Sequence, residues 1–144
     1  MTMMDIDGII DDLEKRLRED EKKRFSEIAL REARNPQNMG RIKNPDCQAW
    51  ITGPCGDSME FTLRIRGGII EDIRFMTDGC GSSIACGSIT TKMVLGKRLE
   101  YARNITDLTI LDELEGLPRE NRHCAKLAAD TLAEAIQSLK NQEG

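Results

Sequence analysis

The segment Met59-Glu60-Phe61-Thr62-Leu63-Arg64-Ile65-Arg66-Gly67-Gly68 decides the fold of this chain. Before the glycines, apolar residues alternate with polar ones, which is the period-two pattern of a strand with one buried face. The glycine pair is typical of a tight hairpin turn. Residues 69–76 carry most of their apolar side chains at odd positions, Ile69 included, so we expect them to return antiparallel. With a further strand expected over residues 47–53, the sequence predicts a three-stranded meander.

Apolar residues at helical spacing predict the other elements of the fold. A helix that includes Phe25 is expected to end at Asn35-Pro36, because proline disfavours a helical residue before it. In the last predicted helix Cys124 opens the apolar stripe, so its sulfur is expected to face the body of the protein. Helices are expected from Ser82, a suitable N-cap, to Gly96, over residues 99–105, over residues 106–116, and from Cys124 to Leu139.

The composition restricts the possible functions. The 144 residues suit one domain, and charged residues make up 32% of them with a net charge of −4. There is no long basic block, so nucleic-acid binding is not expected, and no stretch is apolar and long enough to cross a membrane. The acidic start, Met1 to Asp7, is unlike a signal or transit peptide, which predicts a cytoplasmic location. Five cysteines in a reducing compartment favour metal or sulfur chemistry over disulfides.

Three of the cysteines lie in settings that suit a metal site: Gly53-Pro54-Cys55-Gly56-Asp57, Gly79-Cys80-Gly81-Ser82-Ser83 and His123-Cys124. Glycine lets the backbone turn tightly around a metal, while aspartate and histidine are additional ligands. No two cysteines have the CxxC spacing, so the fold must gather them, and an open site is expected. Cys80 precedes a predicted helix, whose free N–H groups and dipole lower the pKa of a nearby thiol. In an extended chain Asp57 and Cys55 would point to the same side.

These three motifs, in this order and together with residues 34–40 (Arg-Asn-Pro-Gln-Asn-Met-Gly), resemble the IscU/NifU N-terminal family of iron–sulfur cluster assembly scaffolds. There are 24 residues between Cys55 and Cys80 and 43 between Cys80 and Cys124, as in the compact members of that family. The resemblance implies an α+β fold of the SufE/NifU-like kind, in which a three-stranded antiparallel sheet packs against several helices. This agrees with the elements expected from periodicity.

The resemblance also implies a function. A scaffold of this kind is not an enzyme; it assembles a transient [2Fe–2S] cluster from iron and from sulfur supplied by a cysteine desulfurase, and passes it to apo iron–sulfur acceptor proteins. Cys124 matches the cysteine that generally accepts the persulfide in the family, and the sequence leaves Cys55 as an alternative acceptor. The empty site also suits Zn²⁺. The residues that match cluster or metal ligands are Cys55, Asp57, Cys80, His123 and Cys124.

Two other functions use the same residues. The first is a zinc-binding persulfide acceptor that works with a cysteine desulfurase, although its known branch carries an insertion that this chain lacks. The second is a stable electron carrier, which is disfavoured because such proteins normally hold the cluster with cysteine alone. The sequence leaves open whether Asp57 or His123 is the resting fourth ligand, and whether the chain forms a homodimer or a trimer.

Some positions depart from the family pattern. Compact bacterial members carry a Leu-Pro-Pro-Val-Lys segment that a DnaK-like chaperone reads, whereas this chain has Leu117-Pro118-Arg119-Glu120-Asn121, which makes that partner doubtful. Cys86 and Cys47 are interpreted as small packing residues. Residues 1–24 are predicted to form an N-terminal helical extension, with a slight preference for a role in interactions, before a scaffold domain over residues 25–144.

Overall fold

The computed structural model describes residues 8–9, 12–13, 15–16 and 24–143. Residues 140–143 are described by their backbone alone. The described residues before Arg24 are helical, and Arg16 forms an ion pair of 3.1 Å with Asp12. Most of the predicted extension over residues 1–24 lies outside the described residues, so its role stays a prediction. Among the residues described, no helix is both long enough and apolar enough to span a bilayer.

A three-stranded antiparallel sheet forms the centre of the molecule, as the alternation of residues predicts. The strands are β1 (Cys47–Thr52), β2 (Ser58–Arg66) and β3 (Ile69–Thr77), and their order in the sheet is β1-β2-β3. The central strand β2 therefore pairs with a neighbour on each side. Its residues Met59 and Phe61 are completely buried, which agrees with the inward face expected from the sequence.

One detail of β3 differs from the prediction. The odd-position pattern places Ile69 toward the core, but Ile70 is the residue that is completely buried. The cause is a register shift: Arg64 pairs with Asp72 while Ile65 pairs with Ile70, so β3 contains one extra residue at this point. Such a bulge reverses the faces of the strand on one side of it.

The helices occur in the order that the sequence predicts, with α2 before the sheet and the others after it. The residue before α3 is Cys80, which occupies the N-cap position expected for Ser82, and it does so without a side-chain capping bond. The last helix is continuous and extends beyond the predicted end at Leu139. The elements are α2 (Glu27–Arg34), α3 (Gly81–Val94), α4 (Leu99–Arg103), α5 (Asp107–Glu113), the 3-10 turn η1 (Arg119–Asn121) and α6 (His123–Glu143).

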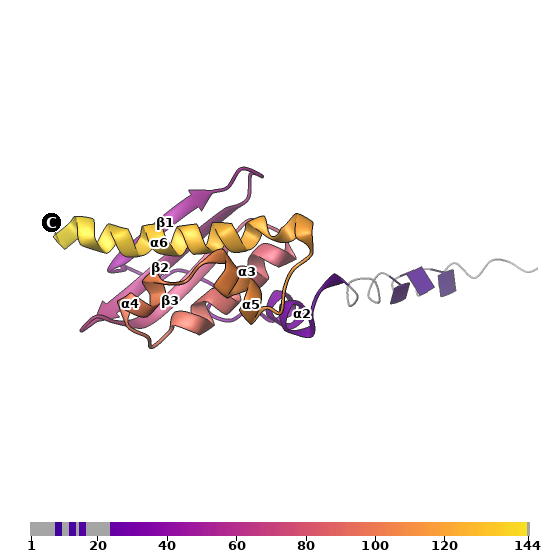
Figure 1. Cartoon of the computed structure of the whole chain (residues 1–144), viewed down its shortest axis with the longest axis horizontal. Helices are drawn as coiled ribbons and strands as arrows, with labels where there is room; N and C mark the ends of the chain where they lie inside the picture. Colours follow the sequence, from indigo (N-terminus) through magenta and orange to yellow (C-terminus); the bar gives the residue numbers. More distant parts are fainter. Residues whose placement is uncertain (1–7, 10–11, 14, 17–23, 144) are drawn as a thin grey trace, which may run out of the picture.

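Helices α3 and α6 pack on the sheet and on each other, α6 against β1 and β2 and α3 against β3 (Figure 1). The approach of α3 to β3 is very close, because a Cβ atom built on Gly87 would lie 2.3 Å from Cδ2 of Phe75. Helix α2 packs on α3, and the buried carboxylate of Glu32 accepts a 2.7 Å hydrogen bond from Lys92. Helix α3 therefore lies between the sheet and α2.

We expect Gly87→Ala to destabilise the protein by about 1–3 kcal/mol, because the added methyl group would overlap the ring of Phe75 and force α3 away from β3. Gly81→Ala is the matched control in the same helix, since its Cβ would meet only Ala33 at an ordinary 3.7 Å. That variant should be neutral or more stable by up to about 1 kcal/mol. Urea denaturation measures both, and equal stability of the two variants would contradict the close contact.

Candidate metal centre

The ligand-type side chains come from three places that the fold brings together: the turn between β1 and β2, the start of α3 and the start of α6. They form two overlapping groups, within each of which one ligand atom of every residue lies within 4.8 Å of the others. Asp57 belongs to both groups. The first group is Cys55, Asp57 and His123, and the second is Asp57, Cys80 and Cys124.

The turn that carries Cys55 and Asp57 is closed by its own backbone. The N–H of Gly53 donates to the carbonyl of Asp57 at 2.8 Å, and the N–H of Gly56 donates to the carbonyl of Gly53 at 3.0 Å. Gly56 has a φ of 91°, a conformation that favours glycine. The two ligand residues therefore meet through a tight turn, and the extended chain expected for them is wrong.

This turn is also joined to the segment that leads into α3. The N–H of Ser58 donates to Oδ1 of Asp78 at 2.7 Å, and the hydroxyl of Thr77 donates to the carbonyl of Ser58 at 2.6 Å. The N–H of Gly79 then donates to the Thr77 hydroxyl at 3.1 Å. These bonds fix Asp57, which precedes Ser58, relative to Cys80, which follows Gly79.

Cys80 is exposed at the N-terminus of α3. Partial burial opposes ionisation of its thiol, but hydrogen bonds from the backbone N–H groups of Ser83 and Ser82 outweigh this effect, so its pKa lies below the ordinary value of 9.0. The direction is the one expected for a thiol at a helix start. The side chain also lines an open groove of about 430 Å³ between α2 and η1.

Cys124 lies in the same group but has a different environment. It is completely buried, and this burial raises the pKa of its thiol to about 11, although a hydrogen bond from Ser83 acts in the opposite direction. Because the native state holds the proton more tightly than the unfolded chain, the resulting stability is present below about pH 9 and is lost as the pH rises toward 11. Without a metal, Cys124 is a neutral thiol at neutral pH.

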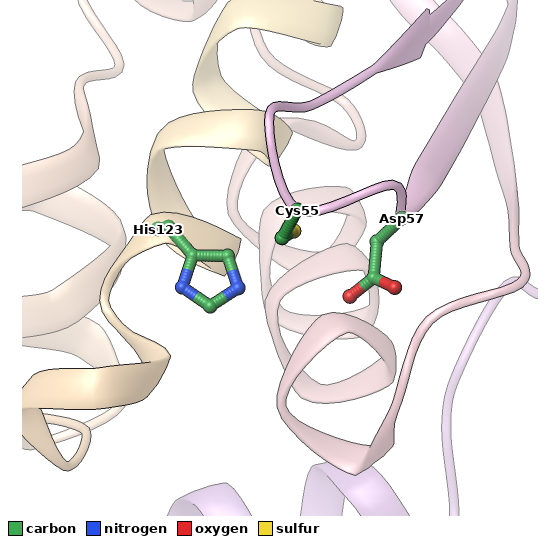
Figure 2. Close-up of side chains that lie close together, drawn as sticks. All are labelled: Cys55, Asp57 and His123. Atoms are coloured by element: carbon green, nitrogen blue, oxygen red, sulfur yellow. The ribbon is translucent and has the colours of Figure 1, made fainter.

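The first group lies at the surface. Figure 2 shows the side chains of Cys55 and Asp57, on the turn between the strands, close to the imidazole of His123 at the start of α6. Nε2 of His123 lies 3.7 Å from the sulfur of the buried Cys124, its neighbour in sequence. Cys55 and His123 also line a cavity of about 250 Å³ that continues along α6 to Asp130. The exposed candidate ligands Cys55 and His123 therefore lie next to the buried thiol of Cys124.

Comparison with known protein families shows which family has this fold and these candidate ligands. The family model described as the NifU-like N terminal domain matches residues 24–144. The chain belongs to the NifU-like N-terminal domain family. The sequence prediction of the family is thus confirmed, and the match begins one residue before the start predicted for the scaffold domain.

Relatives of this NifU-like domain are known from distant bacteria. The chain is 40% identical over 123 residues to the iron-sulfur cluster assembly scaffold protein IscU of Aquifex aeolicus, covering 83% of this chain and 78% of the relative. It is also 40% identical over 123 residues to the protein of that name from Escherichia coli K12, covering 82% and 95%. The crystal structure of a nitrogen-fixing NifU-like protein (N-terminal) from Brucella abortus matches with a TM-score of 0.66 at 21% identity, covering 84% and 97%, and supports the fold.

The other two cysteines of the NifU-like domain belong to its core. Cys86 and Cys47 are completely or almost completely buried, and neither is a member of the two ligand groups. Burial raises the pKa of Cys86 well above its ordinary value and raises that of Cys47 to about 11. Both observations agree with the packing role expected from the sequence.

Two residues near the ligands were not singled out by the sequence pattern. Asp78 holds the turn between β1 and β2, and Ser83 contacts both Asp57 and Cys124. The only signal for Ser83 was its position three residues after Cys80, on the first turn of the helix that Cys80 begins. For Asp78 the only signal was its place directly after a strand, and an acidic residue there can pair with many different groups.

The environments of the thiols predict their reactivity. When the metal-free protein is treated with iodoacetamide at about pH 8, we expect Cys80 and Cys55 to be alkylated first, because both are exposed and the pKa of Cys80 is lowered. Cys124, Cys86 and Cys47 should react only after unfolding in urea. Mass spectrometry of the digested protein measures each site. Alkylation of Cys124 as fast as Cys80 in the native protein would contradict the buried environment.

Proposed function

We propose that this chain is a scaffold on which a [2Fe–2S] cluster is assembled and from which it is passed to apo-proteins. The observation that carries the proposal is the pair of overlapping ligand groups joined by Asp57. Two adjoining sets of donors suit a cargo with two metal ions better than they suit a single metal ion. The donors also suit iron bound to sulfur, because thiolates are its usual ligands in clusters, while carboxylate and imidazole complete the coordination.

The names of the relatives support the same function. The matching proteins from Aquifex aeolicus and Escherichia coli are named iron-sulfur cluster assembly scaffold protein IscU, and each is covered over more than three quarters of its length. A scaffold holds its cargo without turnover of its own. We therefore place this chain among carrier and assembly proteins rather than among enzymes.

The chemistry of assembly requires a sulfur donor and a reductant. A cysteine desulfurase supplies sulfur as a persulfide, whose outer sulfur has the oxidation state of elemental sulfur. Two such sulfurs need four electrons to become two sulfides. Two Fe²⁺ ions provide two electrons as they become Fe³⁺, and one dithiol or two one-electron reduced ferredoxins provide the other two. The scaffold contributes the ligands and their geometry.

The state of the thiols constrains how sulfur arrives. Cys124 is the proposed persulfide acceptor, but in the metal-free protein it is buried and its thiol is neutral at neutral pH. Transfer to it therefore requires the binding of the desulfurase or of a metal ion to uncover or deprotonate this thiol. The groove beside Cys80, with Phe25 and Leu30 on one wall and Glu120 on the other, is a path by which a partner segment can reach Cys80, whose sulfur lies within 4.8 Å of that of Cys124.

Several partners and properties remain proposals. A cytoplasmic location rests on the acidic start of the sequence, and apo iron–sulfur proteins as acceptors rest on the resemblance, while the choice between a homodimer and a trimer stays open. The segment from Leu117 to Asn121 departs from the chaperone-binding pattern, and here Leu117 is buried while Arg119–Asn121 form η1. A buried leucine is not available to a peptide-binding chaperone, which agrees with the doubt about a DnaK-like partner.

The proposal is tested by anaerobic reconstitution. The protein is supplied with Fe²⁺, cysteine, a dithiol and a catalytic amount of cysteine desulfurase, and absorption and Mössbauer spectra are recorded before and after addition of an apo-ferredoxin. We expect a [2Fe–2S] spectrum that forms on the chain and then moves to the ferredoxin. If persulfide accumulates on a zinc-loaded protein and no cluster forms, the chain is instead a zinc-binding persulfide acceptor. A cluster that forms but never leaves would identify an electron carrier.

Asp57 is expected to keep the cluster labile, because a carboxylate is a harder and weaker ligand for iron than a thiolate. We predict that Asp57→Ala assembles a cluster but transfers it to apo-ferredoxin at least about 10-fold more slowly, a change typical of altered metal coordination. The rate of transfer is followed by circular dichroism. Asp78→Ala provides the comparison, since it loosens the same turn but keeps the carboxylate of Asp57, which separates loss of the ligand from loss of its support. Transfer from Asp57→Ala at the wild-type rate would refute this role.

A further inference from the structure

Ser83 is a completely buried polar residue whose side chain contacts two of the ligands. It lies in the first turn of α3, and its Oγ donates a hydrogen bond of 3.4 Å to Sγ of Cys124. The same Oγ lies 3.5 Å from Oδ2 of Asp57. One hydroxyl group thus touches a ligand from the turn between β1 and β2 and a ligand from α6.

Two other buried hydroxyl groups in the helices satisfy their donors differently. Thr90 and Thr131 each donate to a carbonyl of their own helix four residues earlier, at 2.6 Å. This is the usual way in which a helix satisfies a buried hydroxyl. The side chain of Ser83 is directed out of its helix toward Asp57 and Cys124, where it makes longer contacts. A role in the metal centre explains this choice of partners better than helix stability does.

Gly79 provides the space in which the hydroxyl of Ser83 lies. A Cβ atom on Gly79 would lie 2.4 Å from Oγ and 2.6 Å from Cβ of Ser83, and 3.1 Å from Oδ2 of Asp57. Any side chain at this position would therefore push Ser83 or Asp57 away from its present position. The glycine before Cys80 is thus required by its close approach to Ser83 and Asp57.

We propose that Ser83 is a positioning residue of the metal centre, which fixes the carboxylate of Asp57 and the sulfur of Cys124 relative to each other. This inference rests on the proposed function, because it takes both residues as ligands. A side chain that holds ligands in place before metal arrives reduces the ordering that binding would otherwise require. After binding, the same hydroxyl is placed to donate to the thiolate of Cys124, and such bonds tune the metal–sulfur interaction.

The test uses metal binding by the full chain and needs no cluster. Zn²⁺ affinity is measured anaerobically by competition with a chromophoric chelator, and the sulfur-to-metal charge-transfer band is recorded with Co²⁺. Four proteins are compared: wild type, Ser83→Ala, Ser83→Thr and Ser88→Ala. Ser88 is the matched control, since it is a buried serine of the same helix whose Oγ accepts a 2.8 Å hydrogen bond from the N–H of Gln37, away from the ligands.

We expect Ser83→Ala to bind Zn²⁺ about 10-fold more weakly, as is typical when a residue that orients a ligand is removed. Its Co²⁺ band should move to longer wavelength, because a thiolate that loses a hydrogen bond gives up its electrons more easily. Ser83→Thr keeps the hydroxyl and should restore both properties. Ser88→Ala should match wild type in both, even if its urea midpoint falls. Gly79→Ala, which displaces Ser83 without removing its hydroxyl, should resemble Ser83→Ala.

Two results would overturn the inference. The first is an unchanged affinity and an unchanged band in Ser83→Ala. The second is an equal loss in Ser88→Ala, which would mean that any buried hydroxyl of α3 matters only for folding. Failure of the proposed function would look different, because it would appear in the anaerobic reconstitution as the absence of a transferable [2Fe–2S] cluster, whatever the Zn²⁺ affinities of these variants.

Discussion

The ring of Phe75 occupies the space where a side chain of residue 87 would lie, so α3 packs directly on β3. The position of the candidate metal centre depends on this contact. The contact brings α3 onto β3, so the start of the helix lies at the end of the sheet where the turn between β1 and β2 also lies. Helix α6 packs on β1, β2 and α3 and starts at the same place. Three segments that are distant in sequence thus deliver Cys80, Asp57 and Cys124 to one location.

The sequence predicted the order of the elements because their patterns are local. Alternation from Met59 to Arg66 is decided by the two faces of a strand, and the glycine pair after it permits the hairpin. The bulge near Ile65 was not predictable in the same way, because a register shift depends on how two strands pair and leaves little trace in either one. The N-cap of α3 was assigned to a serine on propensity, whereas the chain uses Cys80.

The candidate ligand residues could be named from the sequence because cysteines beside glycine, aspartate or histidine suit a metal site. The burial of Cys124 was expected from its place on the apolar stripe of the last helix and is confirmed, whereas the exposure of Cys80 depends on how α3 packs. The contacts of Ser83 could not be predicted from the sequence for a related reason. Serine near a helix start is usually a cap, and only the spatial neighbours of its hydroxyl reveal another use.

The position of Asp57 in both ligand groups has a consequence for the order of filling. A carboxylate has only two oxygens, so Asp57 serves both groups only when it bridges them. A metal ion that takes both oxygens removes this donor from the other group. If both groups bind metal ions, the first ion to arrive determines how many donors remain for the second, so the two positions would not be independent in a titration. Under the proposed function, Asp57 therefore couples the filling of the two groups.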